Sequence, residues 1–280
     1  MCRWMGWLGQ PVLIDELLFK SQHGIVDQSL HSRMGAEPTN GDGFGLGWYG
    51  VGEHPALYHS VAPAWGDANL RELAAHIESR LFLAHVCAAI GSPVQQTNCH
   101  PFRHGNWLFV HNGFVGDFRE LRRDLMLAME PDHFAAVEGS TDTEVVFRLA
   151  LGLGLEQDPV RALEHTVGLI EETARRRGRE PMVQATFGVS DGASLWAVRY
   201  ATTGPARSLF ASSVASTVRE LYPDNARFAR LKDDDRLIVS EPFADLPGVW
   251  EEIPQSSAVR VAPGGVFDQS PFAPLSAPVP

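Results

Sequence analysis

Three cysteines, Cys2, Cys87 and Cys99, are all that this chain of 280 residues contains. Three is an odd number, and it is too small for the disulfide framework on which small secreted domains depend. We therefore expect each cysteine to be a free thiol, and we expect the protein to reside in the cytoplasm.

The chain also lacks a long apolar run and a surplus of basic residues. No stretch approaches the roughly 18 apolar residues of a membrane-spanning helix, and the start, MCRWMGW, does not have the apolar core of a signal peptide. The 23 Lys and Arg residues against 34 Asp and Glu give a formal net charge of −11. This balance argues against a surface that binds nucleic acid or anionic membranes, so we expect neither partner.

Apolar residues, in contrast, make up 44% of the chain, which is enough for a full core. Apolar and alternating runs predict strands, and helical spacing predicts helices. The predicted strands are 2–8, 41–49, 80–87, 107–112, 182–189, 194–200, 236–240 and 257–261. The predicted helices are 12–20, 69–79, 118–129, 158–177 and one that begins at 140–144.

The order of these elements is strands, then helices, then strands again. This order favours layered α+β packing over the strand-helix alternation of a doubly wound sheet. The stretch from residue 263 onward is rich in proline, which favours a disordered tail. We therefore expect one domain over 2–262 and a disordered tail over 263–280.

Cys2 directly follows Met1. If Met1 is removed, the Cys2 thiol lies beside its own free α-amine, whose pKa of about 8 makes it a usable base. The thiolate is the attacking form of a cysteine. Cys2 is therefore a candidate nucleophile, although an incidental cysteine at this position has the same local sequence.

Asn112 and Gly113 end a predicted apolar strand. A side-chain amide and a backbone N–H at this place can both point into a cleft, and a tetrahedral oxyanion needs two such donors. The alternative is that the Asn-Gly pair forms a turn. Asp142 begins a predicted helix, where it either caps the helix or holds a substrate ammonium group.

Two other kinds of site can be weighed from the sequence. The residues considered as a zinc cluster are His85, Cys87, Cys99, His100, His104 and His111. Their spacing lacks the paired pattern of a zinc site, so we expect no metal and no other cofactor. The glycines at 41, 43, 45 and 47 match neither a dinucleotide fingerprint nor a P-loop. They predict instead a strand face without side chains, which a neighbour or a substrate can approach closely.

Taken in order, these segments resemble the glutaminase domain of the class II glutamine amidotransferases. The resemblance rests on the initial MCRW, the glycine strand, His85-Val86, TNCHPF at 97–102, His111-Asn112-Gly113 and STDTE at 140–144. It extends from Cys2 to about residue 242 and is strongest to the stand-alone bacterial members, a group similar to the γ-glutamyl hydrolases of ergothioneine synthesis and glutathione breakdown. The resemblance implies a four-layer αββα sandwich, the fold of the N-terminal-nucleophile hydrolases.

The resemblance also implies a reaction and a role for each candidate residue. Cys2 would attack a γ-glutamyl amide, with its own α-amine as the base, and water would hydrolyse the thioester. Asn112 and Gly113 would form the oxyanion hole, and Asp142 would hold the substrate α-amine. The substrate would be a small γ-glutamyl compound, and any ammonia released would go to a separate synthase or leave as a by-product.

One segment departs from the family pattern. Where the family has His-x-Arg-x-x-Thr, with the arginine on the substrate α-carboxylate, residues 85–90 read HVCAAI. Cys87 and Ile90 therefore stand in place of the arginine and the threonine. A charge-assisted hydrogen bond contributes roughly 1.5–3 kcal/mol, so free glutamine would bind about ten- to a hundredfold more weakly. Arg103 and Arg3 are the candidates for a replacement cation.

The same departure supports a different class of function. A protein that kept the fold but lost efficient turnover would be a non-catalytic γ-glutamyl ligand-binding protein, with altered carboxylate recognition at Cys87 and Ile90. Covalent labelling of Cys2 by a thiol-alkylating glutamine analogue would favour the enzyme, whereas reversible binding without labelling would favour the binding protein.

Overall fold

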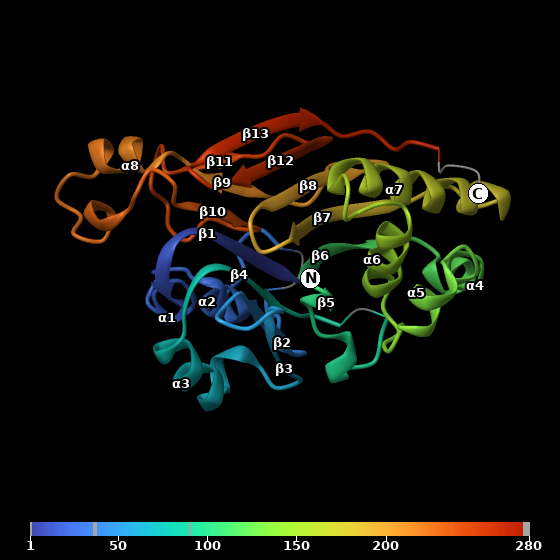
Figure 1. Cartoon of the computed structure of the whole chain (residues 1–280), viewed down its shortest axis with the longest axis horizontal. Coiled ribbons are helices and arrows are strands. Elements are labelled where there is room, and N and C mark those ends of the chain that lie inside the picture. Colours follow the sequence, from blue (N-terminus) through green and yellow to red (C-terminus); the bar gives the residue numbers. More distant parts are fainter. Residues whose placement is uncertain (1, 36–37, 90, 277–280) are drawn as a thin grey trace.

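Two antiparallel sheets form the centre of the computed structural model, which describes residues 2–35, 38–89 and 91–276 (Figure 1). Within these residues, sheet A has seven strands, in the spatial order β11 (Trp250–Glu252), β9 (Phe210–Ser212), β10 (Arg236–Val239), β1 (Arg3–Leu13), β4 (Glu78–Val86), β2 (Phe44–Trp48) and β3 (Ala56–Ser60). Sheet B has six described strands, in the order β13 (Val266–Pro271), β12 (Ser257–Ala262), β8 (Leu195–Ala201), β7 (Val183–Ser190), β6 (Trp107–Val115) and β5 (Phe102–His104).

Helices cover the outer faces of both sheets. The sheet A side carries α1 (Ile14–Leu18), α2 (Ile25–Leu30) and α3 (Ala68–His76). On the sheet B side, α6 (Asp142–Gly152) and α7 (Pro159–Arg176) contact the strands, and α4 (Phe118–Leu127) and α5 (Pro131–Ala135) pack against these helices. The left end of Figure 1 is formed by α8 (Ala215–Leu221) and its surroundings. No described helix is both long enough and apolar enough to cross a bilayer.

The buried apolar side chains divide into three clusters, one for each interface between layers. Between the first helices and sheet A lie Met5, Ile14, Ile25, Leu70 and Phe82. Between the two sheets lie Trp4, Leu8, Leu83, Leu108, Val110 and Leu195. Between sheet B and the later helices lie Phe109, Phe147, Leu163, Val167 and Phe187. The predicted four-layer αββα sandwich is confirmed.

Strand alternation explains how one short segment serves two of these interfaces. In β1, Trp4 and Leu8 face sheet B while Met5 and Trp7 face the helices, because successive side chains of a strand point to opposite faces. A strand that is covered on both faces carries apolar residues at nearly every position. This accounts for the burial of β1 from Arg3 to Leu8.

Strand β2, which carries the alternating glycines, is approached closely by two other segments of the chain. A Cβ added at Gly45 would overlap the backbone oxygen of His100, and one at Gly47 would lie 2.9 Å from a methyl carbon of Leu108. Gly45 and Gly47 therefore let the chain around His100 and strand β6 approach sheet A closely. The close approach that the sequence predicted is made by a neighbouring segment.

Replacing Gly45 with alanine is expected to destabilise the protein by about 1–3 kcal/mol or more, because the obstacle is backbone and cannot rotate away. Urea unfolding of Gly45→Ala measures this loss. Gly66→Ala is the matched control, since a Cβ there meets no atom within 4 Å. Equal stability of the two variants would show that this close approach does not exist.

The predicted disordered tail needs correction. Residues 266–271 form β13, which pairs with β12 from Ser257 to Ala262. Gly264 and Gly265, both with positive φ, make the turn of this hairpin. Farther on, Phe272 is buried and packs on Tyr200. The proline content concealed a hairpin signal, and only residues 277–280 of the expected tail lie outside the described residues.

Candidate active site

A cavity of about 120 Å³ lies at the start of β1. Its walls come from segments that are far apart in the sequence, because β1, β4, β6 and the first turn of α6 all end or begin there. Five predicted site residues meet in these walls, namely Cys2, Cys87, Asn112, Gly113 and Asp142. Ile90, another position that the sequence singled out, lies outside the described residues.

Cys2 is positioned by the pairing of β1 with β4. The register sets Arg3 opposite Val86, which brings Cys2 beside Cys87, and the two sulfur atoms are 3.8 Å apart. The carbonyl of Cys2 accepts a hydrogen bond of 2.9 Å from Nη1 of Arg3. The Cys2 backbone is thus held at the entrance to the strand while its thiol faces the cavity.

The environment favours the ionised form of this thiol. A hydrogen bond from Cys87 lowers the pKa of Cys2 well below its usual value and outweighs burial, which raises it; the nearby His85 lowers it further. The pKa of Cys87 is raised well above the usual value by the same contact and by burial, so Cys87 stays protonated. Cys99 also stays protonated, because burial raises its pKa to about 11.

Asn112 lies inside strand β6, not in the turn that was the alternative for an Asn-Gly pair. Only 1% of the residue is exposed, and its Nδ2 has no hydrogen-bond partner among the described residues. A buried donor without a partner is costly and uncommon in folded proteins. In the wall of a cavity that also holds a thiol, such a donor is well placed for a substrate oxygen.

The backbone N–H of Gly113 points away from the neighbouring strand β7. The N–H groups of His111 and Val115 donate to Nδ1 of His100 at 3.4 Å and to Oδ2 of Asp142 at 2.8 Å, so both point away from β7. Because alternate residues of a strand direct their N–H groups alike, the N–H of Gly113 points that way too, and Gly113 lines the cavity. A Cβ at Gly113 would overlap the Gln184 carbonyl, so a larger residue would disturb this segment.

His111 holds the end of β6 in place through hydrogen bonds to β7 and α6. Its Nε2 lies 3.0 Å from the Gln184 carbonyl, which can only accept, so this nitrogen carries the proton. Its Nδ1 then accepts from the Thr143 hydroxyl at 3.0 Å. Burial lowers the pKa of His111 and holds the ring neutral. A neutral, doubly hydrogen-bonded histidine therefore ties β6 both to β7 and to α6, next to Asn112.

Asp142 begins helix α6, as predicted, and Thr141 caps this helix by accepting from the Glu144 N–H. The Asp142 carboxylate accepts 2.8 Å hydrogen bonds from the N–H groups of Val115 and Thr143. These bonds fix the carboxylate at the cavity wall, and a carboxylate retains further lone pairs for an ammonium group.

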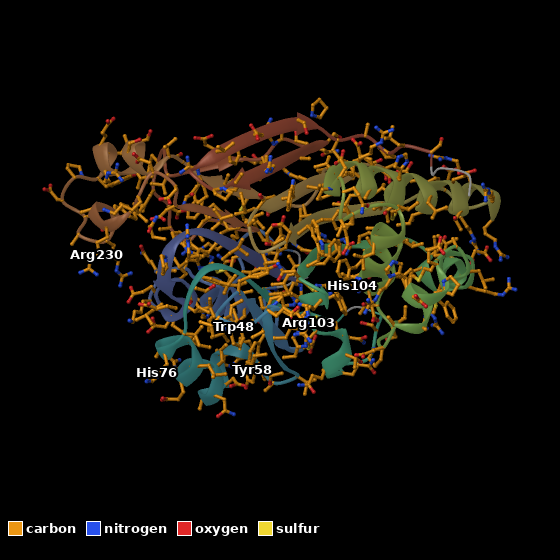
Figure 2. The ribbon with its side chains drawn as sticks, viewed as in Figure 1. Trp48, Tyr58, His76, Arg103, His104 and Arg230 are labelled. Atoms are coloured by element: carbon orange, nitrogen blue, oxygen red, sulfur yellow. The ribbon has the colours of Figure 1, made fainter. Side chains whose placement is uncertain are left out.

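Neither predicted replacement cation reaches the cavity. Arg103, which is labelled in Figure 2, lies on β5. It is not among the residues that line the cavity, and it donates to the Pro55 carbonyl at 2.8 Å. Arg3 is buried and its side chain is already occupied by Glu241 at 3.2 Å and by Ser32 at 2.6 Å. Both residues have structural roles, so neither is free to bind a substrate carboxylate in this arrangement.

Arg207 is a cation in the cavity wall that was not predicted from the sequence. It lies in the segment between β8 and β9, which has no periodic pattern, and it belongs to none of the recognised motifs. Its Nε is buried without a hydrogen-bond partner among the described residues. Among the described wall residues of the cavity, Arg207 is the only arginine or lysine.

The cavity thus combines a thiol with lowered pKa, two N–H donors suited to an oxyanion, and a carboxylate suited to an ammonium group. This set can attack a carbonyl carbon and stabilise the charge that develops on its oxygen. Within the described residues, no group of three or more His, Cys, Asp or Glu is arranged to hold a metal ion.

Comparisons with known proteins agree with this geometry. The family described as class II glutamine amidotransferases matches residues 21–238. A probable glutamine amidotransferase of Saccharomyces cerevisiae is 32% identical over 93% of this chain and 82% of its own length. A γ-glutamyl-hercynylcysteine sulfoxide hydrolase of Mycolicibacterium smegmatis is 28% identical over 93% of this chain and 96% of its own.

A solved structure is similar over the whole chain. The glutamine aminotransferase class II domain protein of Silicibacter pomeroyi superposes with a TM-score of 0.72 and 30% identity, covering 98% of this chain and 100% of that one. Fold, site geometry and sequence therefore agree: the chain belongs to the class II glutamine amidotransferases and is an amidohydrolase-type enzyme.

Proposed function

We propose that this protein hydrolyses γ-glutamyl amides with Cys2 as the nucleophile. The observation that supports this most strongly is the buried Nδ2 of Asn112, which has no partner in the described part of the chain and lies in the wall of the cavity that holds the Cys2 thiol. A donor of this kind has no structural use, but it would complete its hydrogen bonding when an oxyanion forms beside Cys2.

The proposed reaction has two steps. After removal of Met1, the α-amine of Cys2 takes the thiol proton and the sulfur attacks the γ-carbonyl carbon, while Asn112 and Gly113 stabilise the oxyanion. The C–N bond then breaks, the leaving amine takes the proton, and a γ-glutamyl thioester remains. Water, deprotonated by the same α-amine, attacks the thioester and releases glutamate. Throughout, Asp142 holds the substrate ammonium group.

The names of the relatives support a γ-glutamyl substrate, since one is a probable glutamine amidotransferase and another hydrolyses a γ-glutamyl conjugate. A screen of γ-glutamyl compounds for release of glutamate, read by mass spectrometry, tests the proposal. Glutamine, γ-glutamyl peptides and sulfur-containing γ-glutamyl conjugates should be included. Release of glutamate from none of them would reject the function.

A non-catalytic γ-glutamyl-binding protein is the second candidate. Its support is Cys87, which leaves the β4 side of the cavity without the arginine that the family uses. A thiol-alkylating glutamine analogue separates the two functions: stoichiometric labelling of Cys2 supports the enzyme, whereas reversible binding without labelling supports the binding protein.

Cys87 itself gives a prediction about pH. Its thiol stabilises the Cys2 thiolate, so Cys87→Ala should raise the pKa of Cys2 and move the acid limb of the kcat/KM profile to higher pH. At a given pH on that limb, a smaller fraction of Cys2 would be ionised. The pH dependence of Cys2 alkylation in a Cys99→Ala background measures the same shift without substrate.

Cys87→Ser is the matched comparison, because its hydroxyl keeps a hydrogen-bond donor and should restore most of the wild-type profile. An acid limb that stays in place, or that moves to lower pH, in Cys87→Ala would show that the Cys87 thiol does not stabilise the Cys2 thiolate.

A further inference from the structure

A second hollow, of about 440 Å³, adjoins the catalytic cavity. The two share Phe114 and Arg207 in their walls. Met34, Met182 and Gln184 are among the other residues that line the hollow. Ammonia, the amine that free glutamine would release, needs no space of this size, so the proposed function leaves the hollow unexplained.

The hollow lies on the opposite side of Cys2 from Cys87. In sheet A the strand order is β9, β10, β1, β4, and Arg207 belongs to the segment that leads into β9. Cys2 precedes β1, and Cys87 follows β4. Asp142 and Cys87 line the catalytic cavity but not the hollow. A γ-glutamyl group held by Asp142 therefore leaves the hollow free for the group on the far side of the scissile bond.

The segment that carries Arg207 is held rigidly by side chains. Arg199 donates from Nε to the Arg207 carbonyl at 2.8 Å and from Nη2 to the Ala206 carbonyl at 3.2 Å. Gln255 accepts from the Ala206 N–H at 2.8 Å, and Gln184 donates to the Thr203 carbonyl at 3.3 Å. The backbone of this segment is thus fixed on several sides.

The guanidinium of Arg207, in contrast, has no hydrogen bond or ion pair to the described residues, although its Nε is buried. It lies 5.7 Å from the centre of the Phe114 ring, which orients it at the boundary of the two cavities. Oε1 of Gln184, in the same wall, is also buried without a described partner. A cation and an acceptor that are left unpaired in a rigid wall match a ligand that carries a carboxylate and an N–H group.

We propose that this hollow binds the leaving amine of a γ-glutamyl conjugate and that Arg207 binds a carboxylate on that amine. The preferred leaving amine is then an amino acid or a peptide, with Phe114, Met34 and Met182 contacting its apolar part. This inference rests on the proposed function, because it requires a γ-glutamyl bond to be cleaved at Cys2.

Two substrates that differ only in this carboxylate test the inference. γ-Glutamylglycine releases glycine, and γ-glutamylmethylamide releases methylamine. Wild type should prefer γ-glutamylglycine, and Arg207→Gln should lower the ratio of the two kcat/KM values by about ten- to a hundredfold, since one charge-assisted contact is lost. Arg207→Lys keeps the charge but not the forked geometry, so it should restore part of the ratio.

The control is Arg230→Gln, the same change at an exposed arginine far from both cavities, which should leave the ratio as in wild type (Figure 2). Two results would overturn the inference. A ratio unaffected by Arg207→Gln would show that Arg207 does not contact the leaving amine. An equal loss on both substrates would place Arg207 on the glutamyl α-carboxylate or in the fold. Failure of the proposed function is recognised separately, since wild type would then cleave neither substrate, and the inference would fall with it.

Discussion

Cys2→Ala is expected to lower kcat/KM for γ-glutamyl amide hydrolysis by about four to six orders of magnitude. Removal of the nucleophile eliminates the thioester route, and the remaining groups of a catalytic site retain only a small part of the rate enhancement. The fold should persist, because the hydrogen bonds of the Cys2 thiol to described residues are long, at 3.8 Å to Cys87 and to the Ala88 carbonyl.

Cys99→Ala is the matched control for this change. The Cys99 thiol donates to the Ser60 carbonyl at 3.5 Å, and its pKa is raised to about 11, so it is protonated and unreactive near neutral pH. Its loss should change kcat/KM by no more than a few fold. If Cys2→Ala retains a substantial fraction of the wild-type rate, Cys2 is not the nucleophile.

The second large effect is expected at Asn112. Asn112→Ala should lower kcat by about a hundred- to a thousandfold with little change in KM, because the amide stabilises charge that exists only in the transition state. Because Nδ2 of Asn112 makes no hydrogen bond to the described residues, its removal should change the melting temperature little.

Asn69→Ala removes the same amide from an exposed position at the start of α3 and should leave kcat unchanged. Kinetics of both variants on one γ-glutamyl substrate give the comparison. An increase in KM at constant kcat in Asn112→Ala would place the amide on the ground-state substrate and remove it from the oxyanion hole.

Much of the fold could be predicted from the sequence because the central strands carry clear patterns. β1, β4, β6 and β8 are buried on both faces and appear as apolar runs. The three-residue strands β5, β9 and β11 are too short to show any period. They are formed by pairing to neighbouring strands, which local sequence does not record.

The candidate site likewise contains residues that could be predicted from the sequence and one that could not. Asn112 and Asp142 could be found because each belongs to a short motif at the end of a predicted element. Arg207 could not, because nothing in its local sequence distinguishes it from the arginines at the surface. Its proposed role depends on the lack of a hydrogen-bond partner among the described residues, which is a property of the folded chain. Arg103 was a candidate for the replacement cation, but its position on β5 directs it to the Pro55 carbonyl instead.

The central claim is a thioester at an amino-terminal Cys2, and mass spectrometry of the active protein tests it most directly. The protein is mixed with a γ-glutamyl substrate, quenched in acid and digested, and the amino-terminal peptide is sequenced. The expected peptide begins at Cys2, without Met1, and carries a γ-glutamyl group on the Cys2 sulfur. A fully active protein that retains Met1, or a γ-glutamyl group on another residue while Cys2 stays free, would contradict the mechanism.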